Sequence, residues 1–212
     1  VMRTPPPDLP SLLLKERIVY LGLPLFSDDD AKRQLGMDVT ELIIAQLLFL
    51  EFDNSEKPIY FYINSTGTSW DTGDAIGFET EAFAICDTLR YVKPPVHTIC
   101  IGQAMGTAAV ILSAGTKGQR AALPHASIVL HQPRSGAQGQ ATDIQIRAKE
   151  VIHNKKAMLE ILSQNTGRSV DQLSKDSDRM SYLNPHEAVE YGVIDRVLSS
   201  RKDLPSEKVL PK

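Results

Sequence analysis

The sequence has few cysteines, no excess of either charge and no long apolar run. Its two cysteines, Cys86 and Cys100, exclude a disulfide framework and a four-cysteine zinc site. Lys and Arg number 23 against 26 Asp and Glu, so the net charge of −3 gives no reason to expect a nucleic-acid or membrane surface. No apolar run reaches the roughly 18 residues of a membrane helix. The composition is that of an ordinary soluble globular protein.

We expect one domain between two loose ends. The opening residues 1–10 contain four prolines and predict an extended arm, because proline lacks the backbone donor that helices and paired strands need. The domain is expected over residues 11–198, and the polar tail 199–212 is expected to be flexible. The chain starts at Val1, which leaves open whether a targeting segment was removed or the sequence begins late.

Strand and helix patterns alternate along the domain. Strands are expected at 17–22, 58–64, 96–101, 119–123, 127–131 and 193–198, and helices at 40–52, 77–91, 103–114, 142–162, 169–175 and 185–191. This alternation predicts an α/β fold. The helix 142–162 is long for such a domain, since 20 residues span about 30 Å. Part of it is expected to project and pack on another subunit, the alternative being a helix that lies across the domain.

The residues themselves point to little catalytic chemistry. Gly102–Thr107 is a glycine-rich turn between a strand and a helix, a typical place for a nucleophile or an anion. It contains no serine or cysteine, and its one hydroxyl, on Thr107, is a poor nucleophile. His131 ends an apolar run and is a candidate base, or simply a hydrogen-bonded residue. The other histidines lack metal-ligand spacing, so neither a metal nor a cofactor is expected.

Six segments resemble, in order, motifs of the ClpP family, the ring-forming serine protease of the Clp system. They are Tyr60-Phe-Tyr-Ile-Asn-Ser65, Thr98-Ile-Cys-Ile-Gly-Gln103, Ala114-Gly-Thr-Lys-Gly118, His131-Gln-Pro133, Gly139-Gln-Ala-Thr-Asp143 and Glu190-Tyr-Gly-Val-Ile-Asp195. The resemblance covers Pro10 to Leu198. It implies the ClpP/crotonase-like fold of stacked β-β-α units, with a projecting handle helix that corresponds to Thr142–Leu162.

The resemblance implies a Ser-His-Asp triad that this chain does not complete. The family serine falls on Gly106, the histidine on His131 and the aspartate on Met180. Glycine has no atom that forms an acyl-enzyme, and methionine cannot accept the Nδ1–H of the histidine. Beside the family's oxyanion hole, Pro-Gly-Gly reads Thr-Gly-Thr here and ends at Thr68. Thr68 and Thr107 are therefore expected in the oxyanion region.

Assembly positions of the family are retained. Asp178 and Arg179 match an acidic–basic pair in the contact between the two stacked rings, and Tyr60 and Tyr62 match the docking surface for the ATPase partner. An insertion of about nine residues in 69–78 and the proline-rich opening resemble the ClpR proteins, the serine-lacking paralogues of cyanobacteria and plastids.

The resemblance therefore implies a non-proteolytic structural and regulatory subunit. It would share mixed heptameric rings with active ClpP and other ClpR subunits in a double-ring core, and meet an Hsp100 (AAA+) chaperone of the ClpC type. The expected location is the chloroplast stroma, or the cytoplasm of a cyanobacterium.

Two other functions stay open at this point. One is an active serine endopeptidase that uses Ser65 or Ser113, and the other is a crotonase-type acyl-CoA-binding enzyme with an oxyanion hole and a carboxylate. Trp70 in the insertion marks either a partner-binding loop or a surface loop packed on its own domain. The acidic loop 26–37 is expected to be solvated.

Overall fold

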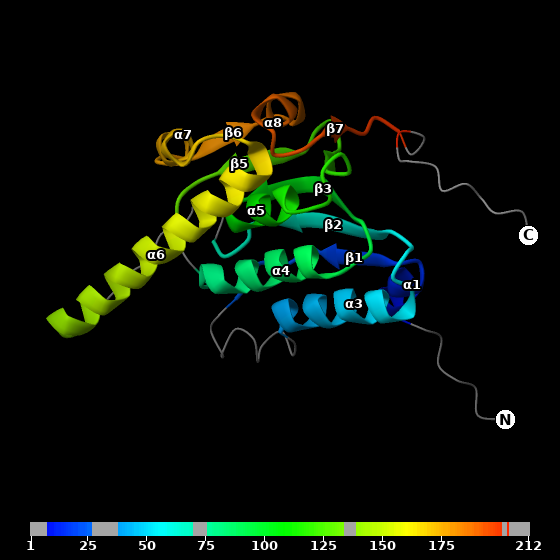
Figure 1. The fold of residues 1–212 in the computed structure, drawn as a ribbon, viewed down its shortest axis with the longest axis horizontal. Helices are drawn as coiled ribbons and strands as arrows, with labels where there is room; N and C mark the ends of the chain where they lie inside the picture. Colours follow the sequence, from blue (N-terminus) through cyan, green and yellow to red (C-terminus); the bar gives the residue numbers. More distant parts are fainter. Residues whose placement is uncertain (1–7, 27–37, 70–75, 134–138, 201–202, 204–212) are drawn as a thin grey trace, which may run out of the picture.

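The computed structural model describes residues 8–26, 38–69, 76–133, 139–200 and 203. In this part of the chain helices and strands alternate, which confirms the α/β class (Figure 1). The strands are β1 (Ile18–Leu21), β2 (Ile59–Ser65), β3 (Val96–Met105), β4 (Ala121–Ala122), β5 (Ser127–Leu130), β6 (Ser181–Leu183) and β7 (Arg196–Val197). The helices are α1 (Leu9–Lys15), α3 (Val39–Asp53), α4 (Glu79–Tyr91), α5 (Thr107–Ser113), α6 (Ala141–Thr166), α7 (Val170–Asp176) and α8 (Pro185–Tyr191).

The sheet is mostly parallel and divides at β3. Along one path the strand order is β1-β2-β3-β4-β7, with parallel pairing throughout. The first half of β3 pairs with β4, and its second half, from Gln103 to Met105, pairs with β5. Strand β6 then adds to β5 in the antiparallel sense. The C-terminal end of β3 thereby lies beside the C-terminal end of β5, which pairs with the first residue of β6.

The core lies between the sheet and the helices α3, α4 and α5. Along β2 burial alternates, and Ile59, Phe61 and Ile63 are fully buried in the core cluster with apolar side chains of these helices. The alternate residues of β2 face the other side of the sheet, where a second, smaller cluster lies. Successive side chains of a strand point to opposite faces of the sheet, so β2 buries one set in the core and leaves the other set partly covered.

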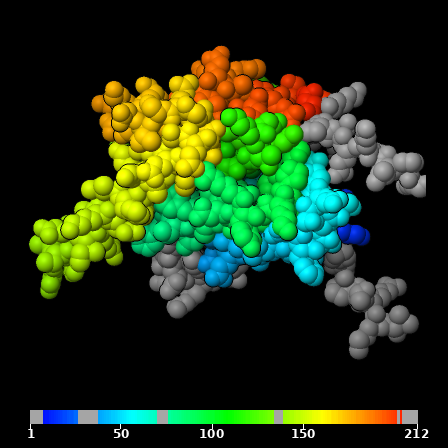
Figure 2. All heavy atoms as spheres, viewed as in Figure 1, coloured from blue at the N-terminus to red at the C-terminus, as the bar shows by residue number. Residues whose placement is uncertain are grey.

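Helix α6 projects from the body, as expected from its length (Figures 1 and 2). It has 26 residues, about 39 Å at the rise of an α-helix. Residues 141–150 are all exposed, and the buried residues Asn154, Met158, Leu159 and Leu162 occupy only its second half. No helix in the described part of the chain combines the length and apolarity of a membrane span.

Two buried arginines tie distant segments together. Arg17 follows α1 and donates hydrogen bonds to the carbonyl oxygens of Leu50, Asn54, Lys57 and Pro58, so it caps the C-terminal end of α3.

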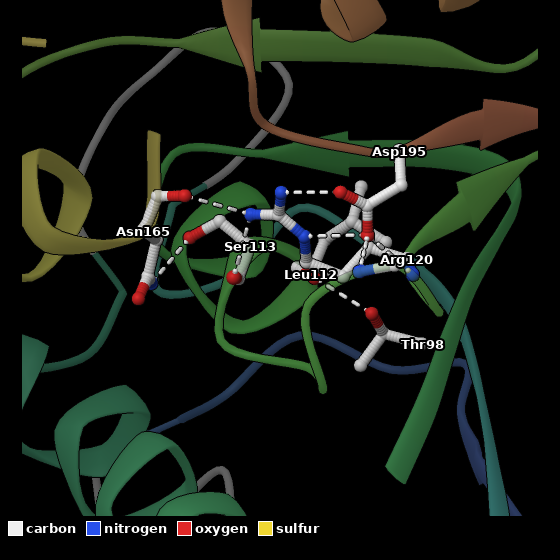
Figure 3. A network of polar contacts seen from close by, with 7 residues as sticks. Thr98, Leu112, Ser113, Arg120, Asn165 and Asp195 are labelled. Carbon is white, nitrogen blue, oxygen red and sulfur yellow. Dashed lines mark hydrogen bonds and ion pairs between the residues drawn. The ribbon is translucent and has the colours of Figure 1, made fainter. Parts of the chain in front are cut away.

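Arg120 donates to both carboxylate oxygens of Asp195 and to the carbonyl oxygens of Ser113 and Asn165 (Figure 3). It links the end of α5, the end of α6 and the segment that leads into β7.

Several boundaries differ from the sequence-based expectations, and α1 and β6 were not expected. The extended arm was expected to reach residue 10, but α1 begins at Leu9, because Pro10 sits in the first helical turn, where its missing N–H costs nothing. The helix expected from Gln103 begins at Thr107, because pairing with β5 keeps Gln103–Met105 in the strand. The strand expected at 193–198 is only Arg196–Val197. The predictions for the arm, the acidic loop, Trp70 and the C-terminal tail fall wholly or mostly on residues 1–7, 27–37, 70–75, 201–202 and 204–212, which lie outside the described residues.

Candidate functional site

The structure brings together the three positions at which the resemblance places the triad. Gly106 directly follows β3, and its N–H donates to the carbonyl oxygen of Val129 in β5 at 2.8 Å. The β5–β6 pairing ends with Leu130 opposite Ser181. The next residue outward on each strand is His131 and Met180. Three segments that are far apart in the sequence thus place Gly106, His131 and Met180 at one edge of the sheet.

Gly106 lies directly against the imidazole of His131. Its φ of +52° and ψ of −113° belong to a region that residues with a side chain rarely adopt. An ideal Cβ at this position would lie 2.4 Å from His131 Nε2. Position 106 is therefore where a side chain would meet the histidine base, and glycine supplies no atom there.

His131 is held by a backbone carbonyl. His131 is 5% exposed, and its Nδ1 lies 3.0 Å from the carbonyl oxygen of Gln132. This contact fits the interpretation of His131 as a hydrogen-bonded residue, which the sequence left open beside that of a base. A carbonyl is neutral, however, so it orients the ring without the charge that stabilises an imidazolium.

Met180 makes no contact of the kind that an aspartate would provide. It is partly buried, and its Sδ accepts a weak hydrogen bond from the hydroxyl of Tyr182 at 3.6 Å. A thioether cannot replace a carboxylate as the partner of an imidazolium.

Asp178 and Arg179 are exposed in the segment between α7 and β6. Gln132 Nε2 donates to the carbonyl oxygen of Asp178 at 3.2 Å and to its Oδ1 at 3.4 Å, and Lys155 Nζ donates to Gln132 Oε1 at 2.7 Å. The Asp178 carboxylate thus contacts Gln132, which in turn contacts Lys155 of α6.

Thr68 and Thr107 contact one another. The Thr68 N–H donates to Thr107 Oγ1 at 2.9 Å, and the two hydroxyl oxygens lie 3.1 Å apart. Both residues are buried. The close approach requires glycine at position 67, where φ is +68° and an ideal Cβ would lie 2.3 Å from Thr107 Oγ1. The sequence placed both threonines in the oxyanion region but did not predict this bond.

The two serines considered as alternative nucleophiles form local hydrogen bonds. Ser65 Oγ donates to the carbonyl oxygen of Leu23 and accepts from the Gly67 N–H. Ser113 Oγ donates to the carbonyl oxygen of Val110 and accepts from Asn165 Nδ2. Both serines are almost fully buried, so neither geometry is that of an activated nucleophile.

Helix α4 carries a buried carboxyl group that was not predicted from the sequence. Glu79 is the first residue of α4, and it accepts a hydrogen bond from Asn154 Nδ2 of α6 at 3.3 Å. Burial raises the pKa of Glu79, although its backbone hydrogen bond and Asn154 oppose the shift. A glutamate in the first turn of a helix is usually explained by its favourable interaction with the helix dipole, so the sequence gave no sign that Glu79 is buried.

Tyr60 and Tyr62 lie on the outer face of the sheet, away from the core helices. Together with Ile101 they pack on Ile99, Ala121 and Leu198, and we call these six residues the outer-face cluster. Tyr60 also contacts the ring of His97, with 5.0 Å between centroids. Tyr20 pairs in register with Tyr62 and is 48% exposed. An apolar surface therefore continues from the cluster to the edge of the sheet.

The described residues contain no group of three or more His, Cys, Asp and Glu side chains that could hold a metal ion.

Comparison with known proteins identifies the family. The family model described as Clp protease matches residues 7–201. An ATP-dependent Clp protease proteolytic subunit-like protein of Synechococcus elongatus is 79% identical over 204 residues, which are 96% of this chain and 90% of that protein. Clp protease proteolytic subunit 2 of Gloeobacter violaceus is 53% identical, over 92% of this chain and 82% of that protein. Chloroplastic proteolytic subunit-related protein 4 of Arabidopsis thaliana is 49% identical, over 93% of this chain and 61% of that protein. The chain therefore belongs to the Clp protease family, and within it to the group that contains these cyanobacterial and chloroplastic subunits.

Proposed function

We propose that this chain is a non-proteolytic structural and regulatory subunit of the ATP-dependent Clp protease core. The observation that carries the proposal is the contact between Gly106 and His131. At position 106, where an ideal Cβ would lie 2.4 Å from His131 Nε2, the chain has no side chain. Without a nucleophile there is no acyl-enzyme, and covalent peptide hydrolysis cannot begin.

The surroundings of His131 support the same proposal. The residue just before β6, beside His131, is the neutral Met180, and His131 Nδ1 lies 3.0 Å from the neutral carbonyl oxygen of Gln132. At the position of the family aspartate, methionine therefore supplies no carboxylate to stabilise a positive charge on the ring, as the aspartate of a Ser-His-Asp triad does.

Assembly is supported by apolar surface that the single chain leaves uncovered. On α6, Ile146 is 67% exposed and Ile152 is 68% exposed, and Phe52 at the end of α3 is 91% exposed. Single exposed apolar residues are ordinary, but residues 141–150 of α6 are all exposed, and a projecting helix that carries large apolar side chains favours contact with another protein. We infer that α6, with Asp178 and Arg179, meets the opposite ring, and that the chain shares mixed heptameric rings with active ClpP and with other ClpR subunits.

We further infer that the outer-face cluster, with Tyr60 and Tyr62, takes part in docking an Hsp100 (AAA+) chaperone of the ClpC type. An inactive subunit in the ring would lower the number of active sites per chamber and alter the docking surface offered to the chaperone. The relatives in cyanobacteria and in the chloroplast fit a location in the chloroplast stroma or the cyanobacterial cytoplasm.

Native mass spectrometry combined with fluorophosphonate labelling tests the proposal. The complex is purified from its source, its subunits are identified, and the label on each subunit is quantified. We expect a large mixed complex in which the active ClpP subunits carry label and this chain carries none. The active subunits in the same sample are the internal positive control, and heat-denatured complex is the negative control. Label on a serine of this chain would overturn the proposal.

A further inference from the structure

A second barrier to catalysis lies beside the missing nucleophile. We propose that the hydroxyl of Thr107 closes the carbonyl-binding hole from within, so that this subunit would be unable to stabilise an oxyanion even with a serine at position 106. The inference rests on the proposed function, because it takes the region of Thr68 and Thr107 as the hole of an inactive protease subunit.

The backbone supplies the frame of such a hole. The N–H of Thr107 follows position 106 directly in the chain, at the start of α5. Thr68, 39 residues earlier in the chain, lies against the side chain of Thr107. These two backbone N–H groups are the donors that would bind a developing oxyanion if the region is the hole of a protease subunit.

The Thr68 N–H already has a hydrogen-bond acceptor. It donates to Thr107 Oγ1 at 2.9 Å, and the same oxygen lies 3.1 Å from Thr68 Oγ1. The hydroxyl thus occupies the place on the amide that a substrate carbonyl oxygen would need. Because Thr68 and Thr107 are 3% and 5% exposed, water does not compete for these bonds and the contact is maintained.

Glycine at position 67 makes the closure possible. An ideal Cβ there would lie 2.3 Å from Thr107 Oγ1 and 2.8 Å from the backbone nitrogen of Ala108. The loop can therefore approach α5 closely enough for a side-chain hydroxyl to reach the Thr68 amide. Serine at position 107 would keep this hydroxyl, whereas alanine would lose it and leave its place on the Thr68 amide empty.

The test restores the missing groups and then opens the hole. In the Gly106→Ser/Met180→Asp background, Thr107→Ala is compared with Thr107→Ser and with unchanged Thr107, and the rate of fluorophosphonate labelling is measured. We expect Thr107→Ala to label about 10²–10³-fold faster than the other two, the usual effect of one oxyanion donor. Equal labelling of all three at a measurable rate would overturn the inference.

A second measurement decides the case in which none of the three is labelled. Hydrogen–deuterium exchange at the Thr68 amide is followed at residue level in the same proteins. An exchange rate about tenfold higher in Thr107→Ala alone supports the closed hole, and equal rates in all three contradict it. Failure of the proposed function has a different signature, because it requires label on the unmodified chain.

Discussion

Introducing the missing serine is the most informative perturbation of this subunit. Gly106→Ser places a hydroxyl at the position whose Cβ would lie 2.4 Å from His131 Nε2. We expect no useful peptidase activity, because the neutral Met180 replaces the carboxylate, and loss of that group costs about 10⁴ in kcat in serine proteases. We also expect lower stability, since the backbone at φ +52° and ψ −113° is strained for any residue with a side chain.

The loss of stability can be estimated from the geometry. Backbone strain of this kind costs about 1–3 kcal/mol, and displacement of the buried His131 ring adds to it. For a chain of this size, 1 kcal/mol shifts Tm by about 2–4 °C, so Gly106→Ser is expected to melt about 2–12 °C below the unmodified protein. Differential scanning calorimetry measures the shift, and a fluorogenic peptide measures turnover.

Two control variants separate the causes. Gly106→Ala introduces the same Cβ without a hydroxyl and should lower Tm by the same amount. Gly118→Ala also adds a Cβ at a positive φ, +86°, but nothing lies within 4 Å of that Cβ, so it should lower Tm less. Turnover of Gly106→Ser within 100-fold of an active subunit, or an unchanged Tm, would refute the reasoning about this site.

Three further predictions concern other parts of the fold. Burial alone would raise the pKa of the Asp195 carboxyl, but hydrogen bonds and the charge of Arg120 hold it below its usual value. This carboxylate therefore stabilises the fold above its unfolded pKa of about 3.9 and loses that effect as the pH falls, so Asp195→Asn should flatten the decline of Tm below about pH 5. Arg17→Ala leaves the C-terminal carbonyls of α3 uncapped and should cost roughly 2–4 kcal/mol in urea unfolding, and Arg17→Lys, with one point charge, should recover only part. Burial raises the pKa of Cys86 to about 12 and that of Cys100 to about 11, so native protein should show no thiol reactive to Ellman's reagent at pH 8 and denatured protein should show both.

The α/β class, the projecting helix and the three triad positions could be predicted from the sequence alone. Helix α6 was predictable because its length and stripe of apolar residues are properties of one continuous segment. Gly106, His131 and Met180 were found by matching short motifs, and the structure places them together. These features depend on which residues follow one another within short segments, so they can be identified in the sequence itself.

Contacts between distant segments could not be predicted from the sequence and are visible only in the folded chain. The extension of β3 through Met105 depends on pairing with β5, which overrides the helical propensity of an alanine-containing segment. The Gln132 carbonyl beside His131 Nδ1 and the Thr107 hydroxyl on the Thr68 amide depend on the backbone path to within a few tenths of an ångström. Hydrogen bonds are that sensitive to distance and direction, whereas motif spacing fixes only the order of the residues, so the closed hole became visible only in three dimensions.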